Sequence, residues 1–153
     1  MSDVYEKTKE PQGDLGEIQK SLFTLLQVDA NLANALLVEE LIARRTDLTL
    51  ITANTGYKGI EMACSCLPDL ILMDIDLYDI NGLDAMKVLR QNPATVHIPV
   101  IALSSNAFSK KMEEEQRSGF FRYLTKPFSI KEFMATIDVA LDFVVTIRSA
   151  KSS

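Results

Sequence analysis

The chain alternates between short apolar runs and longer helical patterns, and this alternation occurs five times. The apolar runs, rich in leucine, isoleucine and valine, cover residues 22–28, 48–53, 69–74, 99–104 and 121–126. Helical patterns follow each run, at residues 31–45, 58–66, 82–91, 107–118 and 129–145. Right-handed crossovers join such strands into a parallel sheet with helices on both faces. We therefore predict an α/β fold: a doubly wound (βα)5 unit around a five-stranded parallel sheet.

Two of the helical segments carry clear internal signals. The segment 31–45 places an apolar stripe on one side of a helix, made of Leu32, Leu36, Leu37, Leu41 and Ile42. The segment from residue 129 has a start signal, because Ser129 and Glu132 have the spacing of a capping box. Phe128 and Phe133 flank that box and can pack together as a hydrophobic staple.

Composition limits the class of protein. The 153 residues are enough for one domain, and the net charge of −5 argues against a nucleic-acid surface. No apolar run approaches the roughly 20 residues that a membrane-spanning helix needs, and the polar N-terminus is no signal peptide. We expect a cytoplasmic protein without membrane insertion. Its domain should cover residues 20–146, between a tail or linker at 1–19 and a flexible tail at 147–153.

Polar residues stand at the ends of four predicted strands. Asp29, Asp74, Ser104 and Lys126 each end or directly follow an apolar run. In open parallel sheets the working site lies beyond the carboxyl ends of the strands. We therefore expect these four side chains to converge at one edge of the sheet.

The stretch PDLILMDIDLYDING (68–82) raises a question of charge. Asp74, Asp76 and Asp79 follow a buried run closely, and buried carboxylates that lie together repel one another. Either a cation binds there or the acids point to different places. We expect Asp79 to be solvated in a loop, and Asn81 to cap the following helix.

With these landmarks the chain resembles the receiver domain of two-component response regulators over about residues 20–145. The segments NPATVHIPVIALSSNA and GFFRYLTKPF look most like receivers of hybrid sensor histidine kinases. The resemblance implies a flavodoxin-like sheet with strand order 2-1-3-4-5. It also implies site roles: Asp74 as phosphoacceptor, Ser104 and Lys126 as phosphate-binding residues, and Tyr123 as the switch aromatic. Pro127 would follow a cis peptide bond.

The same resemblance implies a Mg²⁺ site, with one departure from the family pattern. Asp29, Asp74 and the backbone carbonyl of Asp76 match the family's metal-binding positions. Receivers usually end the first strand with two acids, and the second of these, a direct ligand, is Ala30 here. Mg²⁺ prefers oxygen ligands and is usually held by one or two carboxylates. Loss of one carboxylate is expected to weaken Mg²⁺ binding.

Three functions follow as hypotheses. The first is a phosphoacceptor receiver, phosphorylated at Asp74 by a histidine kinase or phosphotransfer protein, with self-phosphorylation and autodephosphorylation as its only chemistry. Phosphorylation would reshape the face formed by residues 107–118, 121–126 and the last helix, where an output domain or second receiver docks. The second is a pseudo-receiver interaction module that is not phosphorylated because of Ala30. The third, remote, is an enzyme resembling D-x-D phosphatases, suggested by Asp74-Ile75-Asp76.

Overall fold

The computed structural model describes residues 22–104 and 119–152, and five strands lie within them. They are β2 (Phe23–Val28), β3 (Leu48–Ala53), β4 (Leu70–Asp74), β5 (Val100–Ser104) and β6 (Arg122–Thr125). All pairings are parallel, and the order across the sheet is β3-β2-β4-β5-β6. Numbered along the chain, that is the predicted order 2-1-3-4-5. The predicted fold class is confirmed.

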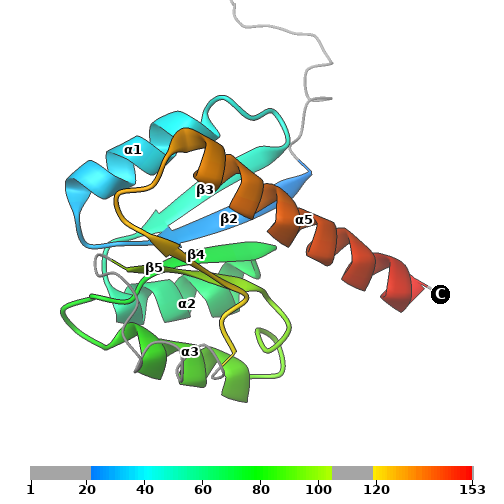
Figure 1. The fold of residues 1–153 in the computed structure, drawn as a ribbon. Helices are drawn as coiled ribbons and strands as arrows, with labels where there is room; N and C mark the ends of the chain where they lie inside the picture. Colours follow the sequence, from blue (N-terminus) through cyan, green and yellow to red (C-terminus); the bar gives the residue numbers. More distant parts are fainter. Residues whose placement is uncertain (1–21, 105–118, 153) are drawn as a thin grey trace, which may run out of the picture.

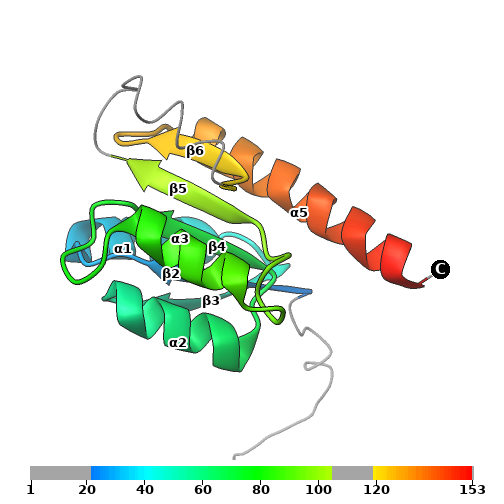
Figure 2. The ribbon, with the colours of Figure 1, turned by 90° about the horizontal axis from the view of Figure 1, so that it is seen from below.

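Helices cover both faces of the sheet (Figure 1). The described residues contain α1 (Leu32–Ile42), α2 (Gly56–Cys66), α3 (Gly82–Gln91) and α5 (Ile130–Ser152). Helices α1 and α5 pack on one face, and α2 and α3 pack on the other (Figures 1 and 2). The predictions of a tail at 1–19 and of a helix at 107–118 lie outside the described residues.

Successive side chains of a strand point to opposite faces of the sheet, so the core consists of two apolar clusters, one on each face. On the side of α1 and α5, Leu25 and Leu72 pack with Phe133, which is fully buried. On the side of α2 and α3, Leu26 and Ile71 belong to the second cluster. Strand β4 is buried along its whole length, as its continuous apolar run predicts.

The start of α5 follows its sequence signals. The Glu132 N–H donates to the Ser129 hydroxyl oxygen (3.0 Å), and the Ser129 N–H donates to a Glu132 carboxylate oxygen (3.1 Å). The rings of Phe128 and Phe133 stack with their centroids 5.3 Å apart. The predicted capping box and staple are both confirmed.

The apolar stripe predicted for the first helix is only partly buried. Val38, Leu41 and Ile42 face the sheet, whereas the side chains of Leu32, Leu36 and Leu37 are 72%, 54% and 42% exposed. The reason is geometric. Apolar residues surround most of α1, and only one side of a helix can contact a sheet. The helix therefore presents a leucine surface to solvent, which we call the α1 leucine surface (Leu32, Leu36 and Leu37).

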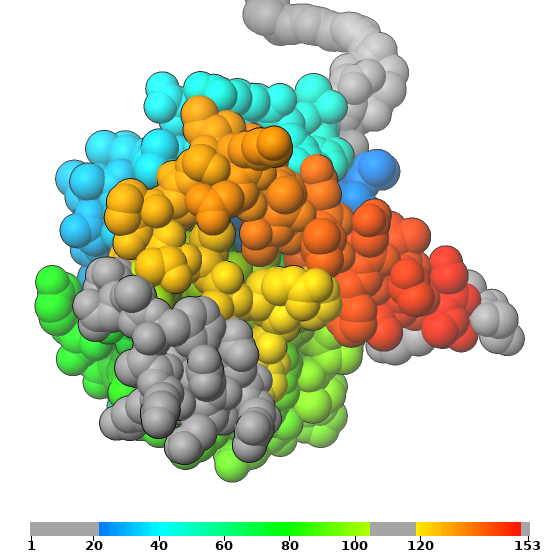
Figure 3. All heavy atoms as spheres, in the orientation of Figure 1, coloured from blue at the N-terminus to red at the C-terminus, as the bar shows by residue number. Residues whose placement is uncertain are grey.

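The segment predicted as a tail at residues 147–153 is helical as far as the structure describes it, because α5 continues to Ser152. No glycine or proline interrupts the segment, so nothing local ends the helix. Arg148 also holds this part of α5 in place, since its guanidinium pairs with the Asp69 carboxylate and lies 5.0 Å from the centre of the Phe23 ring. The end of the helix extends past the strands (Figure 2) and projects from the body of the molecule in the space-filling view (Figure 3).

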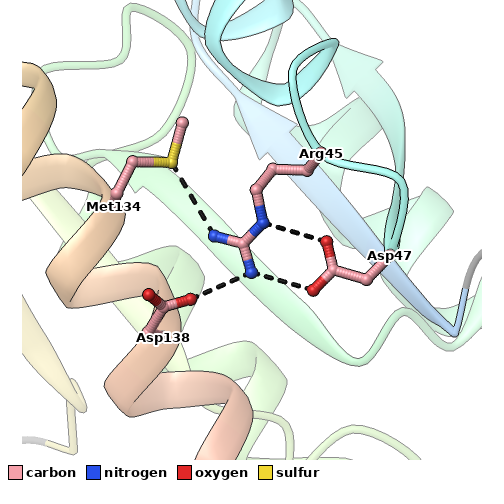
Figure 4. Close-up of polar contacts among 4 residues, drawn as sticks. All are labelled: Arg45, Asp47, Met134 and Asp138. Carbon is pink, nitrogen blue, oxygen red and sulfur yellow. Dashed lines mark hydrogen bonds and ion pairs between the residues drawn. The ribbon is translucent and has the colours of Figure 1, made fainter.

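A polar clamp joins the chain after α1 to α5 (Figure 4). The guanidinium of Arg45 binds Asp47 through two hydrogen bonds of 2.9 and 2.8 Å. The same group pairs with Asp138 of α5 (2.9 Å) and contacts the sulfur of Met134 (3.7 Å). These contacts fix α5 against the end of α1 on one face of the sheet.

Candidate phosphoacceptor site

The four predicted strand-end residues lie at the same edge of the sheet. Asp74 and Ser104 are the last residues of β4 and β5, and Asp29 and Lys126 directly follow β2 and β6. Because the strands are parallel, these carboxyl ends form one rim. Asp29, Asp74 and Ser104 are all buried. Buried acids that lie with a hydroxyl group at the ends of neighbouring strands form a candidate functional site.

Asp74 and Lys126 form a buried ion pair. The Lys126 ammonium nitrogen is 3.4 Å from Asp74 Oδ2, and the two side chains are only 15% and 7% exposed. The backbone N–H of Asp76 donates to the other oxygen, Asp74 Oδ1 (2.9 Å). The backbone N–H of Lys126 donates to the Ser104 carbonyl oxygen (2.7 Å). This hydrogen bond fixes the backbone of Lys126 against the end of β5. The carboxylate of Asp74 is thereby held and partly neutralised.

Asp29 is the second buried acid of the rim. Its Oδ1 accepts the Asn31 N–H (2.8 Å), while Oδ2 is buried without a hydrogen-bond partner among the described residues. Burial raises the pKa of Asp29, and the neighbouring Asp74 carboxylate raises it further. The Asn31 N–H and the Lys126 ammonium act in the opposite direction. Two carboxylates therefore share one ammonium group.

Ser104 and Tyr123 lie on the neighbouring strands β5 and β6. Tyr123 is paired with Ala102, and Ser104 is two residues further along β5, so the two side chains are diagonal neighbours on the side of α2 and α3. The Tyr123 hydroxyl is buried, and its ring packs edge-on against Phe120 with centroids 5.4 Å apart. The structure thus places Tyr123 beside Ser104, one row further from the rim.

Asp79 has a role that the sequence did not reveal. Its two carboxylate oxygens accept the N–H groups of Gly56 and Tyr57, each at 2.9 Å, at the start of α2. These hydrogen bonds, led by the one from Tyr57, lower the pKa of Asp79. Asp79 is exposed in its loop, as expected, and it caps α2 in addition. Its partners lie far away in the sequence, so no local pattern indicates the contact.

The other loop predictions agree with the structure. Asp76 is exposed at the rim, and Asn81 caps α3 by accepting the Leu83 N–H (2.7 Å). Gly82 lies so close to the chain after β4 that an added Cβ would be 2.5 Å from the Ile75 Cα atom. The Lys126–Pro127 peptide bond is cis, the geometry expected for Pro127. The acids of the segment 68–82 thus point to different places.

The donor set at the rim suits a hard cation such as Mg²⁺, although it is short of one acid. Asp29 Oδ2 is a buried oxygen without a hydrogen-bond partner among the described residues, the Asp74 carboxylate is a second buried oxygen donor, and the Asp76 carbonyl belongs to the loop after Asp74. Ala30 contributes only a methyl group. Accordingly, no group of three or more acidic, histidine or cysteine side chains forms a metal site within residues 22–104 and 119–152.

Comparisons with known proteins agree with this geometry. Residues 25–138 match the response regulator receiver domain. The polar-differentiation response regulator DivK of Brucella anthropi is 35% identical over 114 residues, which are 74% of this chain and 92% of DivK. The chain therefore belongs to the receiver domain family of two-component response regulators.

Solved structures show the same fold. CheY4 of Vibrio cholerae, a chemotaxis response regulator, has a TM-score of 0.73 at 20% identity, covering 78% of this chain and 99% of its own. The receiver domain of a sensor histidine kinase from Pseudomonas aeruginosa, described with a magnesium ion in its active-site cleft, has a TM-score of 0.70 at 24% identity. It covers 80% of this chain and 97% of its own. Separately, none of the described helices is long and apolar enough to cross a membrane.

Proposed function

We propose that this chain is a phosphoacceptor receiver in which Asp74 takes a phosphoryl group from a histidine kinase or phosphotransfer protein. The observation that carries the proposal is the buried pair of Asp74 and Lys126 beside Asp29. A pair of this kind is costly to bury and is a poor device for stability alone. Family membership supplies the reaction class, since receivers act in two-component signalling and are generally not enzymes in their own right.

The residues of the rim have distinct tasks in this reaction. A carboxylate oxygen of Asp74 forms a bond to phosphorus, while the P–N bond of the donor phosphohistidine breaks and its electron pair passes to the imidazole nitrogen. The Lys126 ammonium is placed to exchange its contact with Asp74 for one with a phosphoryl oxygen. The Ser104 hydroxyl, at the neighbouring strand end, donates to another phosphoryl oxygen. Mg²⁺, held by Asp29, Asp74 and the Asp76 carbonyl, would neutralise charge on these oxygens.

The output face is the surface that includes β6 and α5. A phosphoryl group adds about −1.5 to −2 charges at the rim and draws the Ser104 hydroxyl toward it. Because Tyr123 is the diagonal neighbour of Ser104, movement of Ser104 changes the space that Tyr123 occupies. On the outer side, Phe143 packs on Phe121 (5.1 Å between centroids) and Val139 is 41% exposed. We expect an output domain or a second receiver to dock on this apolar surface.

The donor is expected to dock on the α1 leucine surface. A donor histidine must reach Asp74 at the rim, and α1 begins only a few residues after Asp29. The exposed leucines of α1 therefore continue directly from the rim, and exposed apolar residues that lie together mark interaction sites. An amphipathic helix of the donor would cover them.

A second function stays open because of Ala30. Without the second acid of the first strand end, the site has two carboxylates instead of three, and its Mg²⁺ affinity falls. If the loss is large, the chain is a pseudo-receiver that binds its partners through the same face without phosphorylation. The two functions differ in one measurable property, the Mg²⁺-dependent gain of a phosphoryl group.

The deciding experiment is intact mass after incubation with acetyl phosphate across a Mg²⁺ titration. We expect a gain of one phosphoryl group that disappears in Asp74→Asn. We also expect Ala30→Asp to lower the Mg²⁺ midpoint by about 10-fold or more, the scale of effect for lost metal-site partners. A gain in Ala30→Asp alone would identify the native chain as a pseudo-receiver. No gain in either chain would overturn the proposal that Asp74 accepts a phosphoryl group.

A further inference from the structure

Gln27 is a buried polar residue of the central sheet, and its neighbours along the strand, Leu26 and Val28, are apolar. It lies in β2, whose sequence is FTLLQV, and its side chain is 1% exposed. Neither its amide nitrogen Nε2 nor its amide oxygen Oε1 has a hydrogen-bond partner among the described residues. The Asp29 Oδ2 atom is likewise buried without a hydrogen-bond partner among the described residues. Three buried polar atoms thus belong to two residues that are two positions apart.

The sheet register places Gln27 directly beneath the acidic rim. Side chains alternate along a strand, so Gln27 points to the same face as Leu25, toward α1 and α5. Gln27 is paired with Leu72 of β4, and Asp29 and Asp74 are each two residues further along. Gln27 therefore occupies the row of side chains immediately below the pair of acids.

A carboxamide at this position does not serve stability. A buried amide without hydrogen bonds is costly, whereas an apolar side chain of similar size, such as the neighbouring Leu25 on the same face, carries no such cost. The amide is, however, the chemical complement of the adjacent acid, because Nε2 carries two donors and Asp29 Oδ2 is an acceptor. Asp29 Oδ1 is already held by the Asn31 N–H.

We propose that Gln27 is a positioning residue for Asp29: its Nε2–H donates to one bridging water, which in turn donates to Asp29 Oδ2 and fixes the orientation of the carboxylate. This inference deepens the proposed function and rests on it for its purpose. With Ala30 in place of a second acid, Asp29 is the only carboxylate at this strand end. A ligand carboxylate that is already oriented loses less freedom on binding a cation, and partners of this kind affect metal affinity strongly.

The first test compares Gln27→Met with Leu25→Met as a matched control on the same strand and face. Methionine keeps the volume of both side chains and removes the amide from one of them only. Mg²⁺ binding is measured by titration calorimetry with the metal alone. We expect the Mg²⁺ dissociation constant to rise about 10-fold or more in Gln27→Met and to stay unchanged in Leu25→Met, with no loss of melting temperature in Gln27→Met. Equal dissociation constants in Gln27→Met and the wild-type chain would overturn the proposal.

The second test needs neither metal nor phosphoryl donor. The side-chain amide signals of Gln27 are identified in a ¹⁵N correlation spectrum by their loss in Gln27→Met. We expect these signals to shift, and their hydrogens to exchange faster, in Asp29→Asn, where the charged acceptor is gone. Signals that stay in place in Asp29→Asn would overturn the role of Gln27. A chain that takes no phosphoryl group would instead overturn the proposed function, and these spectra would still decide on Gln27.

Discussion

At the scale of single residues, the rim is governed by two buried acids that share one ammonium group. Burial and the neighbouring Asp74 raise the pKa of Asp29 in the folded chain. An acid whose folded pKa is raised favours the protonated, folded form. Its contribution to stability is therefore full below the unfolded pKa and is lost as the pH rises through the folded pKa. Without a cation, the ionised form of Asp29 therefore reduces the stability of the fold.

The raised pKa of Asp29 leads to a prediction for the stability of Asp29→Asn in metal-free buffer. The variant should melt at a higher temperature than the wild-type chain near pH 7. The difference should shrink as the pH falls toward about 4, the ordinary carboxyl pKa, because the wild-type acid then becomes protonated. Melting temperatures followed by circular dichroism across this range provide the measurement. Asp142→Asn, at an exposed position of α5, is the control and should show no such trend. A difference that grows in acid would contradict the assignment.

At the scale of elements, the clamp of Arg45 fixes α5 against the end of α1 (Figure 4). The Arg45 side chain is 19% exposed and binds two carboxylates, so its loss leaves hydrogen-bonding groups without a partner. We expect Arg45→Met to lower the free energy of unfolding by about 2 kcal/mol, the scale of hydrogen bonds to charged groups. Urea denaturation at neutral pH measures this change.

The choice of pH and of control matters for that measurement. Arg45 lowers the pKa of Asp47, so the stabilising effect is full above the ordinary carboxyl pKa and is lost as the pH falls through the lowered folded value. Arg44→Met removes a neighbouring, exposed guanidinium and should leave the urea midpoint nearly unchanged. Equal effects of the two substitutions would show that the clamp does not stabilise the fold.

The α1 leucine surface leads to a prediction about phosphotransfer. Leu36→Glu places a charge on this surface, where Leu36 is 54% exposed, and should leave the fold intact. We expect transfer from a phosphorylated phosphotransfer domain to slow about 10-fold or more, because central apolar contacts dominate protein interfaces. Phosphorylation by acetyl phosphate, which needs no docking surface, should be unchanged.

Val88→Glu is the matched control for that experiment. Val88 is an exposed apolar residue (41%) on α3, on the opposite face of the sheet. Transfer from the protein donor should proceed normally in this variant, as followed by intact mass over time. If both variants slow transfer equally, the donor does not dock on α1.

At the scale of the whole molecule, the two apolar clusters share the same five strands. Phe133 anchors the cluster on the side of α5, and Met86 belongs to the cluster on the side of α3. Both side chains are fully buried, so truncation to alanine should cost about 2–5 kcal/mol in either case. Because the strands belong to both clusters, each variant should lower one common urea midpoint.

The measurement compares two probes of unfolding for Phe133→Ala and Met86→Ala. Far-ultraviolet circular dichroism follows the helices, and tyrosine fluorescence follows side-chain packing. Coincident curves in both variants would establish one cooperative unit. Separate transitions, with only one cluster affected by each substitution, would show that the two sides of the sheet unfold independently.

The sequence by itself determined the features that depend on local patterns. Hydrophobic periodicity placed the strands and the described helices, and right-handed crossovers fixed the class of sheet. Side-chain caps at Asn81 and Ser129 were visible because both partners of each cap are close in the sequence. The strand-end residues Asp29, Asp74 and Lys126 could be brought to one edge because parallel strands end together.

Only the tertiary structure decided which side chains form contacts with residues far away in the sequence, and which buried polar side chains have no hydrogen-bond partner among the described residues. Asp79 reaches the start of α2, Arg148 pairs with Asp69, and Gln27 lies beneath the rim with no partner among the described residues. The exposure of Leu36 was equally invisible, since a periodic pattern cannot tell how much of a helix surface the sheet can cover. Such contacts depend on register and on the area available for packing, and both are set by the assembled sheet instead of by neighbouring residues.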